Sequence, residues 1–330
     1  MKKLNVCPST LTAGFDNYSP IATRKLFGGK RVSCVLDFNY DADTTELAES
    51  INQISVSGVQ EKLSAIIENG KIILTPTGVQ GRYIIKPAPS YKHLRYRTFI
   101  PANEHLTMQI AKQIYNINVA ENGIVFFANG DMGYITKRFD IEANGEKIGQ
   151  EDLSSIAQKS LSTHGANFKY TGSYEDIATL LKENVSAWRV EICKLFELIV
   201  FNYIFCNGDA HLKNFSLQQT PNKDYILSPA YDLMNTSIHV QDDDFALTGG
   251  LLPTSEYSDT YRNTGHPCKE DFYTFANRIG VVPKKRDNII EMFSTDNSLV
   301  EELIDRSFLD QRSKRMYLRS YKERLSRFLR

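Results

Sequence analysis

The chain has 330 residues, of which 42% are hydrophobic and 24% are charged, and its 39 basic side chains balance its 39 acidic ones. The length suggests two lobes or domains with a sizeable core, and the zero net charge argues against nucleic acid as a direct partner. The five cysteines include no Cys-x-x-Cys pair, and no apolar run is long enough for a leader or a membrane span, so we expect a soluble, cytoplasmic protein with reduced thiols.

The first half of the chain has the pattern of a β-rich lobe. Residues 1 to about 50 carry no pattern to which we assign chemistry. Asn69-Gly70 lies between the apolar segments 64–67 and 71–75. This dipeptide is the strongest short-range signal for a two-residue hairpin, so the two segments are predicted to pair as strands.

A further strand and a helix are predicted next. In residues 83–87, Pro87 biases Lys86 towards an extended conformation, so Lys86 terminates a buried strand. Asn103 can cap a helix that runs through Ile114 with its apolar residues on one face. More strands are predicted over residues 124–128 and 133–139. This order of strands, helix and strands is that of a kinase small lobe.

From Gln150 onward the pattern turns helical. Helices are predicted over residues 151–161, 174–184, 190–205, 270–279, 287–293 and 299–330. The last of these has an apolar stripe, which we expect to dock on the core, and a basic face, which we interpret as solvated surface. The fold class is therefore α+β, with a β-rich N-lobe over residues 1–145 and a mostly helical C-lobe over residues 146–330.

The segment 205–214 (FCNGDAHLKN) carries the strongest chemical signal. Asp209 and Asn214 are five residues apart, and Asp232 follows Asp209 by 23 residues, with a predicted hairpin between them. An ordinary turn would account for the Asn-Gly-Asp tripeptide alone. The whole set matches the layout of protein kinases, in which an Asp handles the hydroxyl proton and an Asn and a second Asp hold magnesium through hard oxygen ligands.

Seven segments of the chain, in order, carry a resemblance to a known family. They are SVSGVQEKLS (55–64), YIIKP (83–87), NEH (103–105), TKRFD (136–140), QED (150–152), NGDAHLKNFS (207–216) and SPAYDLM (228–234). Together they resemble the HipA family of serine/threonine kinases, the toxins of bacterial toxin–antitoxin systems. The resemblance implies a bilobal protein-kinase-like fold. Because only 54 residues precede the first segment, the chain resembles the shorter, HipT-like form.

The resemblance implies a role for individual residues of these segments. Asp209 resembles the catalytic base, and Asn214 and Asp232 resemble the magnesium ligands. Lys86 resembles the lysine that meets the α- and β-phosphates, and Glu104 either pairs with it or is a solvated acid of the first helical turn. His211 and Lys213 match family positions beside the transferred phosphate, and Phe139 matches a residue that packs on adenine. The loop over the ATP phosphates is matched by Ser57, Gly58, Val59, Gln60 and Lys62.

Ser55 and Ser57 precede Gly58 in the segment that resembles the phosphate loop. Members of the family phosphorylate a serine of this loop, and the HipT-like branch carries a Ser-x-Ser pair there. The resemblance therefore implies autophosphorylation at Ser55, Ser57 or both. A phosphoserine adds about −1.5 to −2 charges beside the ATP phosphates, so we expect the modification to switch the enzyme off.

The resemblance also implies ATP and Mg²⁺ as cofactors and a protein substrate, an aminoacyl-tRNA synthetase, beside the chain itself. The implied partners are a HipB-like DNA-binding antitoxin or a HipS-like small protein. Two alternatives remain open. One is a small-molecule kinase of the aminoglycoside or choline type, because Asp209, His211 and Asn214 also match that catalytic loop. The other is a catalytically silent binding module, against which the complete set of polar site residues argues.

Overall fold

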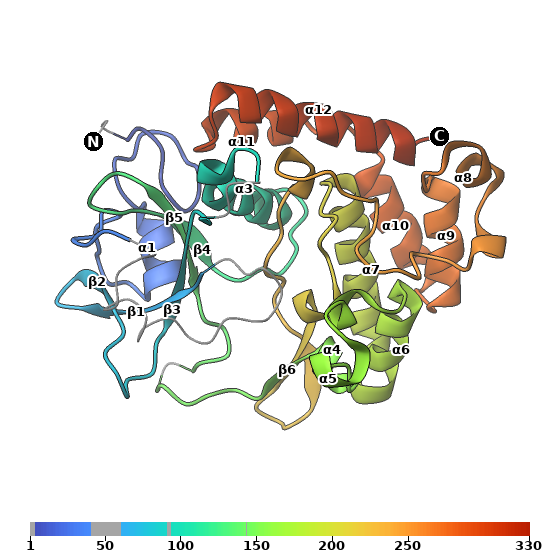
Figure 1. The fold of residues 1–330 in the computed structure, drawn as a ribbon, viewed down its shortest axis with the longest axis horizontal. Helices are drawn as coiled ribbons and strands as arrows, with labels where there is room; N and C mark the ends of the chain where they lie inside the picture. The colour runs from blue at the N-terminus through green and yellow to red at the C-terminus, as the bar shows by residue number, and fades with distance from the viewer. Residues whose placement is uncertain (1–3, 41–60, 91–93, 143) are drawn as a thin grey trace.

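The computed structural model describes residues 4–40, 61–90, 94–142 and 144–330. One part is a five-stranded antiparallel sheet with the strand order β2-β1-β3-β5-β4. Its strands are β1 (Leu63–Glu68), β2 (Lys71–Leu74), β3 (Tyr83–Pro87), β4 (Asn122–Phe126) and β5 (Met132–Lys137). Together with the helices α1 (Pro20–Phe27) and α3 (Ile100–Gln113) it forms what we call the sheet lobe (Figure 1).

The remainder, which we call the helical lobe, begins with a second, three-stranded sheet in the order β6-β7-β8. These strands are β6 (Gln150–Asp152), β7 (Ser216–Gln219) and β8 (Tyr225–Leu227). The helices are α4 (Leu153–Ile156), α5 (Leu161–His164), α6 (Tyr174–Asn184), α7 (Trp188–Ile204), α8 (Asp259–Thr264), α9 (Lys269–Arg278), α10 (Pro283–Phe293), α11 (Ser298–Arg306) and α12 (Gln311–Phe328).

Within the described ranges, five short 3₁₀ helices join these elements: η1 (Arg97–Phe99), η2 (Phe168–Tyr170), η3 (Leu212–Asn214), η4 (Thr236–Ile238) and η5 (Thr254–Glu256). The predicted α+β class with two lobes is confirmed. The predicted boundary between residues 145 and 146 stays a prediction. No helix in the described residues is long and apolar enough to cross a membrane.

The hairpin predicted at Asn69-Gly70 is confirmed. Glu68 pairs with Lys71 across a two-residue turn, and both turn residues have positive φ angles, 48° for Asn69 and 75° for Gly70. Asn and Gly tolerate this backbone at low cost, which is why the dipeptide fixes the register of β1 and β2.

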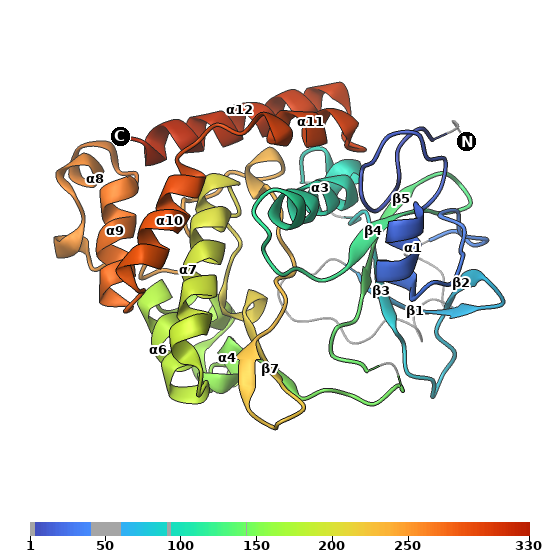
Figure 2. The same ribbon diagram turned by 180° about the vertical axis from the view of Figure 1, so that it is seen from behind.

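The start of α3 differs from the prediction. The helix begins at Ile100, with Pro101 in its first turn, so Asn103 is not its cap. The Asn103 side chain is instead buried, and its Nδ2 donates a hydrogen bond of 2.8 Å to the Asn235 carbonyl oxygen. Every residue from Ile100 to Ala111 is buried, because α3 lies between the sheet and the helical lobe (Figure 2). A helix enclosed on all sides does not show the one-faced pattern that we expected.

Two predicted helices of the second half are interrupted. Residues 151–161 form β6, α4 and the start of α5, because the Asp152 side chain caps α4 and Gln158 adopts a positive φ of 54°. Residues 299–330 form two helices, α11 and α12, because Ser307 is extended and Asp310 caps α12. The other predicted helices are confirmed to within a few residues, and the helix over 174–184 has the bounds of α6.

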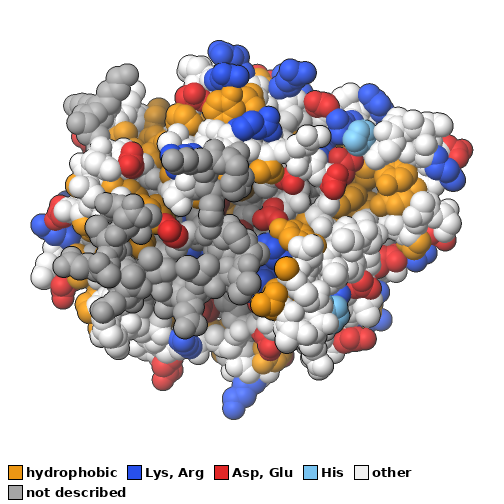
Figure 3. Space-filling model, in the orientation of Figure 1, with side chains coloured by type: hydrophobic (Ala, Val, Ile, Leu, Met, Phe, Trp, Pro, Cys, Tyr) orange, Lys and Arg blue, Asp and Glu red, His pale blue; other side chains and the backbone are white. Residues whose placement is uncertain are grey.

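The helix α12 crosses the top of the molecule in Figure 1 and docks through its apolar stripe, as predicted. Tyr317, Tyr321 and Phe328 are fully buried. The expectation of a solvated basic face is wrong for Arg324, which is buried in an ion pair with Asp244. Elsewhere on the face drawn in Figure 3, positive and negative side chains are interspersed, which agrees with the zero net charge.

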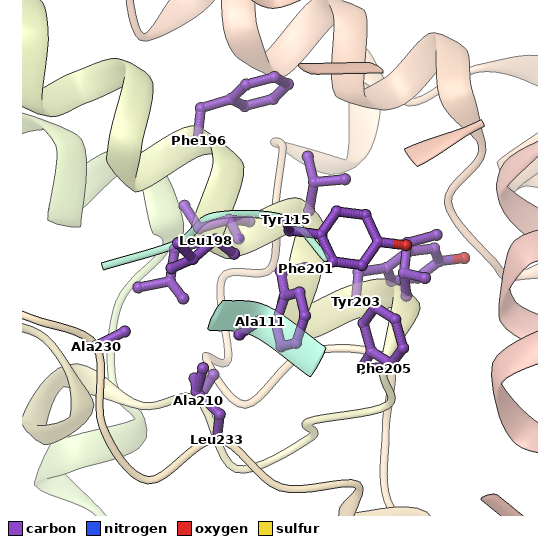
Figure 4. Close-up of a cluster of buried hydrophobic side chains, with 14 of the residues drawn as sticks. Ala111, Tyr115, Phe196, Leu198, Phe201, Tyr203, Phe205, Ala210, Ala230 and Leu233 are labelled. Carbon is purple, nitrogen blue, oxygen red and sulfur yellow. The ribbon is translucent and has the colours of Figure 1, made fainter. Parts of the chain in front are cut away.

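The main core surrounds α7 and ends at the segment that carries Asp209. Phe201 and Phe205 stack on each other with ring centroids 4.5 Å apart, and Phe205 also stacks on Tyr321 of α12. Figure 4 draws Ala210 and Leu233 among the side chains of this core. Because each is adjacent in sequence to a predicted site residue, burial of these two side chains fixes the backbone on which Asp209 and Asp232 are carried.

Candidate active site

The segment from Asn207 to Asn214 and the residue Asp232 meet at the base of one hairpin. Strands β7 and β8 are antiparallel, with Leu217 opposite Leu227, so the chain returns to the place it left. The hairpin predicted between Asp209 and Asp232 is thus confirmed. At its base, Asn214 Nδ2 lies 3.5 Å from Asp232 Oδ2.

Gly208 is a position at which a side chain would not fit. A Cβ atom there would lie 2.7 Å from Cγ of Asp242. The Gly208 amide donates a hydrogen bond of 2.9 Å to the hydroxyl of Thr236. The glycine therefore lets the segment before Asp209 pack directly on residues 236–242, and this packing sets the position of Asp209 relative to the core.

Lys86 is buried at the end of β3 between two carboxylates. Its Nζ atom lies 2.6 Å from Glu104 Oε1 and also contacts Asp232 Oδ1. Of the two alternatives for Glu104, pairing with Lys86 is confirmed. The contact with Asp232 brings a residue of the sheet lobe and a residue of the helical lobe together.

Lys86 and Asp232 each stabilise the charged form of the other. Burial alone would lower the pKa of Lys86, yet Asp232 and Glu104 hold it above its ordinary value. Burial alone would raise the pKa of Asp232, yet Lys86 and Lys62 hold it well below its usual range. For Glu104, burial outweighs the attraction of Lys86 and its pKa is raised. Asp232 is therefore ionised at neutral pH, as a cation ligand must be.

Asp209 projects into the open part of the site. Its side chain is 51% exposed, and its Oδ1 accepts a hydrogen bond of 2.7 Å from the Tyr170 hydroxyl. Desolvation by the surrounding protein raises the pKa of Asp209, while the charge of Lys169 and the hydrogen bond from the Tyr170 hydroxyl act to lower it. One carboxylate oxygen is held and the other, Oδ2, lies 3.9 Å from His211 Nε2. A hydroxyl group can therefore approach the carboxylate from the cavity.

His211 is buried beside Asp209 in the neutral form. Burial lowers the pKa of His211 to about 3, and the neighbouring charge of Lys169 acts in the same direction. Its Nδ1 atom is buried and has no hydrogen-bond partner among the described residues. Lys213 extends from η3 with its Nζ atom 5.7 Å from the ring centroid of Phe168.

These residues line one cavity of about 610 Å³ between the lobes. Of the predicted site residues, the cavity wall includes Lys62, Lys86, Asp209, His211, Lys213, Asn214 and Asp232. Phe139 is not among the described lining residues, but it packs on Tyr231, which is, with ring centroids 5.8 Å apart. Its predicted contact with adenine stays a prediction. Ser55, Ser57, Gly58, Val59 and Gln60 lie outside the described residues.

Lys169 and Tyr170 also line this cavity, and the sequence did not point to them. They come from η2, which follows the wrongly predicted helix over residues 151–161. The only local signal is a lysine between two aromatic residues, and such a triplet is too common to indicate a site.

Asn214 and Asp232 have the donor atoms that Mg²⁺ prefers. Asp232 provides an ionised carboxylate, and Asn214 provides an amide oxygen. That oxygen accepts a hydrogen bond of 3.1 Å from the His211 amide, which orients it and leaves a second lone pair. The donor atoms of the two residues therefore fit a magnesium ion, which Asn214 and Asp232 would hold.

Known proteins resemble the chain in sequence. A Haemophilus influenzae protein named "Putative kinase" is 28% identical, and the alignment covers 97% of this chain and 94% of that protein. The serine/threonine-protein kinase toxin HipA of Shewanella oneidensis is 27% identical over 59% of this chain and 46% of that protein. A Sinorhizobium fredii protein named "Putative kinase Y4dM" is 28% identical over 59% of this chain and 48% of its own length. The chain thus spans about half the length of the last two relatives.

Two solved structures share the fold. One is the complex of Shewanella oneidensis HipA with HipB and operator DNA, with a TM-score of 0.53, 20% identity, and coverage of 88% of this chain and 66% of the other. The other is the Helicobacter pylori proinflammatory kinase CtkA, with a TM-score of 0.51, 14% identity, and coverage of 82% and 90%. These likenesses confirm the kinase-like fold. The shorter, HipT-like form stays a prediction.

A family model described as the HipA-like C-terminal domain matches residues 54–300. This range includes β3, α3, the segment from Asn207 to Asn214, and Asp232. Since the match spans well over half of the sequence, the chain belongs to the HipA family of kinases.

Proposed function

We propose that the chain is an ATP- and Mg²⁺-dependent serine/threonine protein kinase. The observation that carries this proposal is the convergence of Lys86, Asp209, Asn214 and Asp232 on one cavity, with Lys86 bridging Glu104 and Asp232. A lysine on a strand paired with a helix glutamate, facing a second acidic residue at a metal position, is the arrangement that protein kinases need for ATP.

In the proposed reaction, Lys86 binds the α- and β-phosphates, and His211 and Lys213 face the γ-phosphoryl group. Asn214 and Asp232 would hold Mg²⁺, which would neutralise phosphate charge. The substrate hydroxyl oxygen forms a bond to the γ-phosphorus as its proton moves to Asp209. The bond between this phosphorus and the bridging oxygen of ADP breaks, and ADP leaves with the electron pair. The exposure of Asp209 supports access of a protein hydroxyl to this point.

We propose further that the protein acts as the toxin of a bacterial toxin–antitoxin system. The support is that the Shewanella relative is named a kinase toxin and that the solved HipA complex contains HipB and operator DNA. A HipB-like DNA-binding protein or a HipS-like small protein would be the antitoxin. An aminoacyl-tRNA synthetase as substrate follows from the family resemblance alone and belongs to this proposal.

A single assay separates this function from its two alternatives. The purified protein is incubated with γ-labelled ATP and Mg²⁺ in a bacterial lysate. We expect label in a lysate protein and in the chain itself, at Ser55 or Ser57 by peptide mass spectrometry. Label only in small molecules would favour an aminoglycoside- or choline-type kinase, and no transfer would favour a silent binding module. The Asp209→Asn variant is the negative control.

The toxin role predicts growth arrest. Overproduction of the wild-type chain without an antitoxin is expected to stop growth of a bacterial host, and overproduction of Asp209→Asn is not, because only the former transfers phosphate. Colony counts and optical density after induction measure the effect. The matched control is Asp259→Asn, which changes a 94% exposed side chain of α8 and should arrest growth like the wild type. Equal toxicity of Asp209→Asn would count against a kinase toxin.

A further inference from the structure

Lys169 is a buried cation that makes no ion pair within the described residues. Only 6% of the residue is exposed, and it lines the cavity that contains Asp209 and Asp232. Among the described residues, no acidic side chain lies within ion-pair distance of the Lys169 Nζ atom. This atom instead lies over the Tyr170 ring, 4.7 Å from the ring centroid. Burial of an unpaired ammonium group is costly, so a folded protein retains one only where a further anion or a function requires it.

Lys169 differs in this respect from Lys86. Lys86 has two carboxylates in direct contact, so its charge is balanced within the protein. Lys213 lies on η3 with its Nζ atom near the Phe168 ring, and it is partly exposed. Lys169 thus combines burial, access to the cavity and the absence of a described counter-ion.

Tyr170 connects Lys169 to the proposed catalytic base. Its hydroxyl donates to Asp209 Oδ1 at 2.7 Å, and its ring packs edge-on against His211 with centroids 5.2 Å apart. The same ring lies beneath the Lys169 ammonium group. One tyrosine therefore orders the base, the neutral histidine and the buried cation relative to one another.

The backbone of this segment is held by the residues that follow the site. The Thr248 amide donates to the Tyr170 carbonyl oxygen at 2.9 Å, and the Gly249 amide donates to the Gly172 carbonyl oxygen at 2.7 Å. On the other side, Lys159 Nζ donates to the Thr171 carbonyl oxygen at 2.8 Å. These bonds hold the main chain from Tyr170 to Gly172, directly after Lys169, before any ligand arrives.

We propose that Lys169 binds the phosphoryl group in transfer and that Tyr170 positions Asp209 for the substrate hydroxyl. This inference rests on the proposed kinase function and adds two residues to it. Charge on the transferring group is spread over its three non-bridging oxygens, and a fixed cation beside them stabilises the transition state. Lys169 takes up no proton, since the hydroxyl proton goes to Asp209 and the bridging oxygen leaves with ADP. The phosphoryl oxygens supply the anion that Lys169 lacks among the described residues.

The first test is Lys169→Met, which removes the charge and keeps the length of the side chain. We expect kcat to fall about 10²- to 10³-fold, the effect of deleting one preorganised group that stabilises transition-state charge. The affinity for Mg·ATP should change little, because Lys86 and the metal site are intact. The melting temperature should not fall, since no ion pair of the described residues is broken. Lys169→Arg should recover part of the activity.

The matched control is Lys284→Met, which removes an exposed lysine of α10 and should leave kcat unchanged. Unchanged kcat in Lys169→Met would overturn the proposal. So would a loss of ATP affinity at constant kcat, because that result assigns Lys169 to ground-state binding. A lower melting temperature with a proportional loss of activity would make Lys169 structural.

A second measurement separates this inference from the proposed function. Mg·ADP with aluminium fluoride, which mimics the phosphoryl group in transfer, is expected to raise the melting temperature of the wild type more than that of Lys169→Met. If the wild type transfers no phosphate but this difference persists, the kinase proposal fails and the phosphate site stands. If the wild type is active and Mg·ADP with aluminium fluoride stabilises both proteins equally, Lys169 does not bind the phosphoryl group in transfer.

The positioning role is tested with Tyr170→Phe, which keeps the ring and removes the hydroxyl. Asp209 faces Lys169, Tyr170, His211, Asp232 and Asp242, and of these the Tyr170 hydroxyl and Lys169 lower its pKa. Asp209 must be ionised to accept a proton, so loss of the hydroxyl should move the acidic limb of the kcat profile to higher pH. A fall in stability with an unmoved pH profile would show that Tyr170 is only structural.

Discussion

Asp209→Asn is expected to abolish phosphoryl transfer while nearly preserving nucleotide affinity. Asparagine cannot accept the hydroxyl proton, and loss of a positioned base costs about 10²- to 10⁴-fold in rate. The fold should not change, because the side chain is half exposed and the amide oxygen can still accept the Tyr170 hydrogen bond. The rate is measured as label transferred from γ-labelled ATP, and affinity is measured with a non-hydrolysable ATP analogue.

The control for this variant is again Asp259→Asn, which makes the same chemical change at a remote, exposed carboxylate and should keep full activity. Near-normal transfer by Asp209→Asn would remove Asp209 from the role of base. A large loss of nucleotide affinity would instead mean that Asp209 acts on ATP and not on the hydroxyl.

The local signals in the sequence predicted several elements of the fold and the hairpin at the site. Asn69-Gly70 defines its hairpin because few residues tolerate positive φ at both turn positions. The helix α6 has the predicted bounds because Ser173 and Asp176 form a capping box at its start. The spacing of Asp209, Asn214 and Asp232 was also sufficient to predict that these residues lie close together, because a hairpin brings its two ends together.

The sequence failed where distant contacts decide the local structure. Asn103 has the side chain of a helix cap, but burial against Asn235 uses its polar atoms inside α3. Lys169 and Tyr170 lie in a segment whose backbone is held by the Thr248 amide at Tyr170 and by the Gly249 amide at Gly172. Neither contact leaves a periodic pattern in the chain, so neither was predictable from spacing or propensity.

Asp232 has a different proposed role from Asp209, because it would bind the metal and not the substrate hydroxyl. It contacts Lys86 of the sheet lobe and lies beside Asn214 of the helical lobe. Its low pKa, held down by Lys86 and Lys62 against the effect of burial, keeps it negative. In the proposed function, this charge would repel ATP phosphates in the absence of a metal and would hold the Mg²⁺ that offsets their charge. The sign of its effect on nucleotide binding would then depend on the metal.

Asp232→Asn should consequently lose Mg·ATP binding and, with it, phosphoryl transfer by orders of magnitude. Titration of an ATP analogue with and without Mg²⁺ measures this. Mg²⁺ should strengthen binding to the wild type and to Asp259→Asn but not to Asp232→Asn. Metal-free nucleotide should bind Asp232→Asn at least as well as the wild type, because the repelling charge is gone and Lys86 has lost one of its two anionic partners. If Mg²⁺ strengthens binding to Asp232→Asn as much as to the wild type, Asp232 is not a magnesium ligand and the kinase geometry proposed for this cavity is wrong.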